Sequence, residues 1–180
     1  MPYNTINPVV FIDALAEWIE AERDAIRDVS LFSGGWEVWA TTQFPLWLKS
    51  QFQNQEELDA STHVDIVPGA NVPIYENPAK NADLVFNALS PIGAAVPPVM
   101  VVELKCQTPR QRWADFRCRL TENLSKLHST NPDLRERFAD RGAIGLSVGI
   151  SSNDPDLTPA LGHRVRRVDL AIHWWADTEM

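Results

Sequence analysis

The chain has 180 residues, the size of one ordinary domain, and we expect a single domain over residues 1–180. Hydrophobic residues make up 44% and charged residues 22%, which excludes an intrinsically disordered or fibrous protein. The 16 Lys and Arg residues stand against 24 Asp and Glu residues, so the net charge is −8. This balance disfavours a protein that coats nucleic acid with an overall basic surface.

Membrane insertion and secretion are not expected. The longest nearly apolar run, Ile92–Val102, is too short to span a bilayer and contains Pro97 and Pro98. The first residues lack the positive start of a secretory signal. The two cysteines, Cys106 and Cys118, form neither a disulfide framework nor a zinc-binding spacing. We therefore expect a cytoplasmic protein with reduced thiols.

The chain is predicted to begin with a long amphipathic helix over Pro8–Val29. Its apolar residues fall on one stripe at a spacing of about 3.6 residues, and acidic residues fall on the opposite face. After Gly34 and Gly35 break the chain, Trp36–Thr42 alternates well enough for a strand. The segment Leu46–Asp59 is ambiguous, and we interpret it as helical at first and then as a polar loop.

Strand candidates dominate the middle of the sequence. Three short segments have strand-like composition: His63–Val67, Val72–Glu76 and Ala82–Ala88. A loop of proline, glycine and alanine then leads to Val99–Cys106, which is rich in β-branched residues and is the strongest strand candidate. We expect the last two of these strands to pair as a hairpin.

Two helices and two further strands are predicted after this run. Thr108–Gln111 combines a capping box with proline at the first helical position, which predicts a helix start. A second, short helix is predicted over Asn131–Gly142, followed by strands over Ala143–Ile150 and Val165–Trp175. The predicted fold class is therefore α/β (or α+β), with a central mixed β-sheet flanked by helices.

Charged residues lie in the strongest strand candidate, where apolar residues are expected. Glu103 and Lys105 are two residues apart and therefore project from the same face of one strand. Val102, Leu104 and Cys106 project from the other face and should be packed. Burying a carboxylate and an ammonium group in a sheet is unfavourable unless they are paired or hold a metal ion.

A second carboxylate precedes the neighbouring strand. Asp83 stands at the head of an apolar run, and together with Glu103 it forms an oxygen-rich pair suited to Mg²⁺ or Mn²⁺. Lys105 beside this pair would contact an attacking water or a phosphate oxygen. A metal ion, an activated water and a cation are what phosphodiester hydrolysis requires.

This pattern resembles the PD-(D/E)XK nuclease superfamily, which has a restriction-endonuclease-like core. The matching residues are Asp83 and, twenty positions later, Glu103-Leu104-Lys105, on a predicted hairpin followed by a helix. Ala82 replaces the usual proline before the aspartate. The resemblance implies that Asp83 and Glu103 bind Mg²⁺ (or Mn²⁺), that Lys105 is the catalytic lysine, and that the substrate is nucleic acid, DNA rather than RNA. It also makes a homodimer an assembly to expect, because one such site cuts one strand.

Many members of the superfamily add a glutamate from the first helix, and here Glu22 is the first candidate for this third metal ligand. On a helical wheel Glu22 lies near the centre of the apolar stripe, whereas Glu17 and Glu20, the next candidates, belong to the acidic face. The alternative is that Glu22 is a partly exposed edge residue or pairs with Arg110 or Arg117.

Basic residues follow the predicted site. Gln107 extends the strand face of Glu103 and Lys105 and could contact substrate. The next helix repeats a basic residue every seven positions, as Arg112, Arg119 and Lys126. A solvated helix face is one reading, and a strip that contacts phosphates is the other. Three arginines near the last strand would extend such a strip: Arg164, Arg166 and Arg167.

Other acidic residues and the histidines fit these roles less well. Asp65 lies further than Asp83 from the Glu103 strand in sequence, and Asp169 comes after Lys105, in the wrong order. The histidines show no metal-ligand spacing: His63, His128, His163 and His173. The alternative function is a catalytically inactive nuclease-like fold that acts as an acidic protein-binding module, such as a phage or toxin–immunity accessory.

Overall fold

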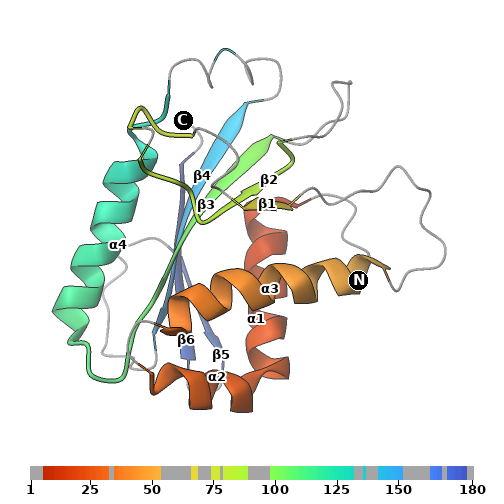
Figure 1. Ribbon diagram of the computed structural model, residues 1–180, viewed down its shortest axis with the longest axis vertical. Coiled ribbons are helices and arrows are strands. Elements are labelled where there is room, and N and C mark those ends of the chain that lie inside the picture. The colour runs from red at the N-terminus through yellow and green to blue at the C-terminus, as the bar shows by residue number, and fades with distance from the viewer. Residues whose placement is uncertain are drawn as a thin grey trace.

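The computed structural model describes residues 6–32, 35–53, 66–68, 74–77, 79–88, 98–131, 136, 142–151, 163–167 and 170–177. Six strands in these ranges form one mixed sheet in the order β1-β2-β3-β4-β6-β5 (Figure 1). The strands are β1 (Ile66–Pro68), β2 (Leu84–Phe86), β3 (Val99–Cys106), β4 (Ala143–Ser151), β5 (His163–Arg167) and β6 (Leu170–Asp177). β3 and β4 are parallel, and every other neighbouring pair is antiparallel.

Helices cover both faces of this sheet. On one side lie α1 (Pro8–Ala21), α2 (Arg23–Ser30) and α3 (Gly35–Gln53), and on the other side lies α4 (Trp113–Leu127) (Figure 1). The predicted class, a mixed α/β fold with helices flanking a mixed sheet, is confirmed. In the described part of the chain, no helix has the length and apolar character needed to cross a membrane.

The main hydrophobic core lies between the sheet and the N-terminal helices. Phe11 packs edge-on against both Phe44 of α3 and Phe86 of β2, with ring centroids 5.3 and 5.5 Å apart. The core side of β3 consists of Met100, Val102, Leu104 and Cys106, all buried in this cluster. Burial of a side chain of this size contributes about 1.5–3 kcal/mol. The predicted alternation along β3 is confirmed, because the intervening residues belong to the α4 side.

The other face of the sheet brings α4 unusually close to β4. Four small residues face α4 at alternate positions of β4: Gly145, Ser147, Gly149 and Ser151. A Cβ atom at Gly149 would lie only 2.7 Å from Cδ2 of Leu120 in α4. The absence of a side chain at Gly149 therefore allows α4 to pack directly on the sheet.

The strand predicted at Trp36–Thr42 is wrong, because these residues are the first turns of α3. Buried residues in α3 recur every four positions, as Trp36, Ala40, Phe44 and Leu48, whereas Val38 is 67% exposed. The short run read as alternation was one part of a helical period. The helical reading of the segment that begins at Leu46 is confirmed as far as Gln53, and residues 54–59 lie outside the described ranges.

The long N-terminal helix is in fact two helices. The break falls at Glu22, which has φ −101° and ψ 19° and separates α1 from α2. In Figure 1, α2 lies across the end of α1 instead of continuing its axis. α2 buries only Ile26, so the apolar stripe that directs α1 onto the sheet does not extend through it.

Other boundaries differ from the predicted ones. Thr108–Gln111 forms a turn, closed by a 3.0 Å hydrogen bond from the Gln111 N–H to the Thr108 carbonyl, and the helix begins only at Trp113. Residue Arg112 is the N-cap and makes no capping bond with its side chain. The predicted strand Val165–Trp175 is instead the hairpin of β5 and β6, in which Arg167 pairs with Leu170.

The other predicted strands and the short second helix fall only partly within the described residues. β2 is shorter than Ala82–Ala88, β1 begins at Ile66, and residues 63–65 lie outside the described ranges. In the segment Val72–Glu76, Tyr75 forms an isolated bridge with Thr130, and residues 72–73 are not described. The helix predicted from Asn131 to Gly142 lies outside the described residues apart from its ends and a helical residue at position 136.

Candidate active site

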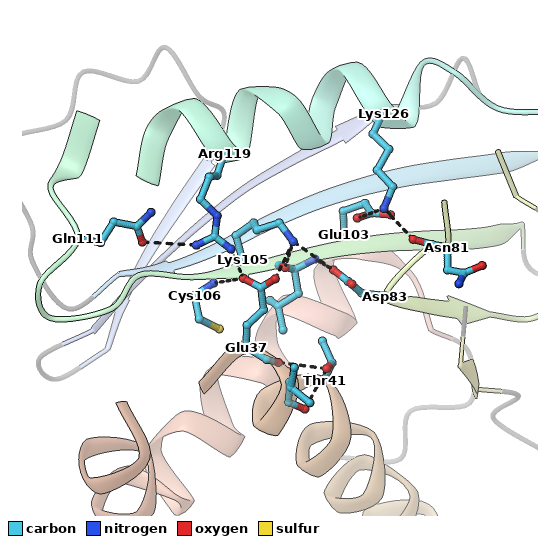
Figure 2. A network of polar contacts seen from close by, with 12 residues as sticks. Glu37, Thr41, Asn81, Asp83, Glu103, Lys105, Cys106, Gln111, Arg119 and Lys126 are labelled. Atoms are coloured by element: carbon cyan, nitrogen blue, oxygen red, sulfur yellow. Dashed lines mark hydrogen bonds and ion pairs between the residues drawn. The ribbon is translucent and has the colours of Figure 1, made fainter. Parts of the chain in front are cut away.

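The site lies where β3 runs on past the first residue of its antiparallel neighbour β2. β2 pairs with β3 from Met100 to Val102, and no strand in the described part of the chain pairs with the next backbone N–H groups on that side. Carboxylates take the place of the missing strand (Figure 2). The Leu104 N–H donates to Oδ2 of Asp83 at 2.7 Å, and the Cys106 N–H donates to Oε2 of Glu37 at 3.3 Å. Two acidic side chains are thereby fixed along an open sheet edge.

Lys105 connects these two carboxylates. Its Nζ atom donates to Oε1 of Glu37 at 2.7 Å and lies 3.9 Å from Oδ2 of Asp83. Burial raises the pKa of Asp83, although the charge of Lys105 and the Leu104 amide oppose this change. Burial alone lowers the pKa of Lys105, but the charges of Asp83 and Glu37 outweigh it and the net direction is upward. The lysine is therefore held as a charged ammonium group.

Glu103 is the most deeply buried charged group of the site, with a side-chain exposure of 1%. The Tyr75 hydroxyl donates to its Oε1 atom, and Nζ of Lys126 lies 2.8 Å from both carboxylate oxygens. Burial, together with the negative charge of Asp83, raises the pKa of Glu103. Burial and the neighbouring Glu103 also raise the pKa of Tyr75 far above its usual range, so its hydroxyl remains a donor.

Two basic residues of the predicted strip reach the site from α4, and the third does not. Arg119 donates from Nη2 to Oε2 of Glu37 at 2.7 Å, and Lys126 binds Glu103 as described above. Arg112 is 82% exposed on its side chain and pairs with Asp115 at 3.0 Å. In the structure, Arg119 and Lys126 are therefore partners of the carboxylates Glu37 and Glu103 and do not form a continuous solvated strip with Arg112.

Gln107 lies beside this network with one unsatisfied atom. Its side chain is buried, and Nε2 donates to the Gln111 carbonyl at 3.0 Å. The side-chain oxygen of Gln111 in turn lies 3.5 Å from Nη1 of Arg119. Oε1 of Gln107 has no hydrogen-bond partner among the described residues, although a buried amide oxygen normally has one. Gln107 is linked to the site through its neighbours and does not contact the carboxylates.

The glutamate that an N-terminal helix contributes is Glu37 and not Glu22. Glu22 is half-buried at the junction of α1 and α2, and its side chain makes no hydrogen bond or ion pair with a described residue. The helical wheel that placed Glu22 assumed one continuous helix, which the break removes. Glu37 was missed because its segment was read as a strand. The signal that could have identified it is the four-residue spacing of Trp36, Ala40 and Phe44 next to it.

The remaining acidic and histidine candidates lie apart from this cluster or outside the described residues. Asp65 and Asp169 are not among the described residues, and the same holds for the side chains of β5, including its arginines. His128 is exposed and lies 3.1 Å from Asp177, and Nε2 of His173 lies 2.9 Å from the Ser151 hydroxyl. These two histidines therefore have structural partners of their own.

Three carboxylates and three cations balance one another in this cluster. The acids are Asp83, Glu103 and Glu37, and the bases are Lys105, Lys126 and Arg119. In the described part of the chain, no group of three or more His, Cys, Asp or Glu residues is arranged to hold a metal ion. The pair Asp83 and Glu103 nevertheless fits Mg²⁺ in donor chemistry, because Mg²⁺ is commonly held by one or two carboxylates, with waters and substrate phosphates as further ligands.

Comparison with known protein families, with curated proteins and with solved structures finds no match for this chain. The geometry of the carboxylate and lysine cluster is therefore the observation from which a function is inferred. Fold and site together describe an α/β protein with a balanced, largely buried ionic cluster at an open sheet edge.

Proposed function

We propose that this protein is a metal-dependent nuclease of the PD-(D/E)XK type, which hydrolyses phosphodiester bonds of nucleic acid, DNA rather than RNA. The observation that carries the proposal is the convergence of Asp83, Glu103 and Lys105. Asp83 precedes β2 whereas Glu103 and Lys105 share β3, yet Lys105 lies 3.9 Å from Asp83, and the charge of Asp83 raises the pKa of Glu103. Clusters of perturbed titratable groups of this kind are concentrated at functional sites.

The order of the elements supports the restriction-endonuclease-like core. Helices come first, β2 and β3 form the expected hairpin, α4 follows, and β4 returns parallel to β3. The residues of the motif lie at the head of β2 and in the second half of β3. The polar residues of β3 begin just past Val102, which pairs with Leu84, the first residue of β2, so the motif lies beside the paired part of these two strands.

Each residue then has a chemical role. Asp83 and Glu103 would hold Mg²⁺ or Mn²⁺, which when bound polarises the scissile phosphate and lowers the pKa of a water. Lys105 is kept charged by its two carboxylate neighbours, and it supplies a fixed cation beside Asp83 for the charge that develops on the phosphate oxygens. Glu37 positions this lysine, because it accepts a hydrogen bond from Lys105 and another from Arg119.

The test is cleavage of supercoiled DNA, linear duplex, single-stranded DNA and RNA at millimolar Mg²⁺ or Mn²⁺. Replacement of Glu103 or Lys105 by alanine should abolish cutting, and circular dichroism should verify that the fold is retained. Lys49→Ala is the matched control, because Lys49 is an exposed lysine on α3. Cutting at the wild-type rate by both alanine variants would overturn the proposal. Light scattering on the same samples tests the predicted homodimer.

A second candidate function is an inactive nuclease-like fold that binds a protein partner, and one feature of the site favours it. Glu103 is buried and both of its oxygens already contact Lys126, so the cluster is satisfied without a metal ion. Large apolar side chains are also exposed among the N-terminal helices: Leu31 and Phe32 just after α2, and Val38 on α3. Absence of both metal binding and cutting in the wild-type protein would favour this candidate. A cytoplasmic location is proposed with either function.

A further inference from the structure

We propose that Lys126 is a built-in competitor of the divalent cation: it occupies the cation position at Glu103 and leaves that carboxylate when a metal ion binds. The proposal rests on the proposed function, since it concerns the same pair of carboxylates. It adds a positioning residue from α4 that the Asp83, Glu103 and Lys105 motif does not contain, and it makes ion binding an exchange between two cations.

The contacts of Lys126 carry this inference. Its Nζ atom is 2.8 Å from both oxygens of Glu103, so the ammonium group covers the carboxylate as a chelated cation would (Figure 2). Glu103 has no other cationic partner within ion-pairing distance among the described residues. A divalent ion can bind Glu103 only if it displaces this ammonium group or shares the carboxylate with it. Two cations at one carboxylate repel each other strongly at such a short separation.

A second set of contacts shows where the ammonium group can go. Nζ of Lys126 also donates to the Asn81 carbonyl at 2.7 Å and lies 4.8 Å from the centroid of the Tyr75 ring. Both groups can hold a cation after it has left Glu103. The lysine side chain is 21% exposed, so its end also has access to water. Displacement from Glu103 therefore does not require Lys126 to lose all of its partners.

Glu103 itself remains held during this exchange. The Tyr75 hydroxyl donates to Oε1 independently of Lys126, and the backbone of β3 is fixed on its other side by the parallel pairing of Glu103 with Ser147. The carboxylate is thus preorganised when the ammonium group departs. The consequence is that the protein alone binds the ion weakly, and that phosphate oxygens of the substrate favour the exchange by adding ligands.

The experiment is calorimetric titration of Mn²⁺ into the wild-type protein and three variants, without nucleic acid. Lys126→Gln removes the charge and keeps a side-chain donor, and it should bind Mn²⁺ about tenfold more tightly because no ammonium group competes. Lys126→Arg keeps the charge and should show no gain in affinity. Lys49→Gln, which removes a charge from an exposed position of α3, should bind like the wild type.

Two outcomes contradict the proposal in different ways. Equal Mn²⁺ affinity in the wild type and in Lys126→Gln overturns the exchange but leaves the proposed metal-dependent nuclease intact. Absence of Mn²⁺ binding in every variant, Lys126→Gln included, overturns the exchange, and it overturns the nuclease as well if the wild-type protein also fails to cut nucleic acid in the cleavage assay.

A measurement on the wild-type protein tests the proposal even if Lys126→Gln does not fold. Acetylation of lysines, followed by peptide mass spectrometry, reports how accessible each amine is. Saturation with Mn²⁺ should increase the labelling of Lys126 severalfold and leave that of Lys49 unchanged. Unchanged labelling of Lys126 at saturating Mn²⁺ would overturn the proposal.

Discussion

The two faces of β3 have the same backbone and opposite chemistry. On the side of α1 and α3, apolar side chains continue to the end of the strand at Cys106. On the side of α4, Val99 and Val101 are apolar, and the charged pair Glu103 and Lys105 follows. The change on this second face occurs just past Val102, the last residue that pairs with β2. The comparison teaches that burial of apolar groups stabilises the strand, and that the open edge beyond β2 is where charges can be placed.

The largest expected effect comes from disturbing the apolar face. Phe44→Ala removes a fully buried ring that contacts Phe11 and Trp18, and it should lower the free energy of unfolding by about 3–5 kcal/mol. Val38→Ala, on the exposed side of the same helix, is the control and should change stability by about 0.5 kcal/mol or less. Chemical denaturation measures both. A small effect of Phe44→Ala would mean that α3 does not pack as described.

A smaller but more specific effect is expected on the charged face. Glu37→Gln removes the carboxylate that binds Lys105 and Arg119, and it should lower the free energy of unfolding by about 1.5–3 kcal/mol. It should also lower the cleavage rate, because Lys105 loses the partner that holds it beside Asp83. Glu20→Gln, an exposed glutamate on α1, should change neither quantity. Denaturation and cleavage assays measure both effects. Equal stability and equal cleavage rates for Glu37→Gln and Glu20→Gln would refute the role of Glu37 in positioning Lys105.

The two faces of β3 should also differ in how they affect the pH dependence of stability, because the carboxylate of Asp83 lies beside the charged face. Burial raises the pKa of Asp83 above its ordinary value of 3.8, so the folded protein retains this proton at a pH where the unfolded chain has lost it. As the pH rises from 3.8 through the raised pKa, the contribution of Asp83 to the free energy of unfolding therefore falls. Asp83→Asn lacks this dependence and should gain stability relative to the wild type over the same interval. Thermal unfolding across this pH range measures the stability difference between Asp83→Asn and the wild type, with Asp13→Asn as the surface control. A difference that does not change with pH would contradict the raised pKa of Asp83.

The smallest effect is expected at the exposed end of the basic series on α4. Arg112 pairs with Asp115 at the surface, where solvent screens the ion pair, so Arg112→Ala should leave the free energy of unfolding nearly unchanged. Arg119→Ala breaks the contact with Glu37 and should have the greater effect. If nucleic-acid binding falls equally in both variants, the residues act as one phosphate-contacting strip, as the sequence spacing suggested.

The comparison of Glu22 and Glu37 shows why part of the site was not predictable. A helical wheel assigns a direction to each side chain only while the helix continues, and the helix that contains Glu22 ends there. Glu37 lies in a short run that fits a strand as well as a helix until the later residues Ala40 and Phe44 are included. Its partners are 68 and 82 positions away in sequence, at Lys105 and Arg119, and no local period encodes such separations.

The local pattern of the sequence by itself determined that Glu103 and Lys105 share one face of a strand whose other face is apolar. The reason is that side chains alternate along any extended backbone, whatever surrounds it. Only the tertiary structure decided that Tyr75, Lys126 and Glu37 meet these residues, because each arrives from a different element whose position depends on core packing. The register of β2 against β3 is of the same kind. β2 begins at Leu84, opposite Val102, so the next N–H groups of β3 on that side bind Asp83 and Glu37, and this register depends on strand pairing between different segments.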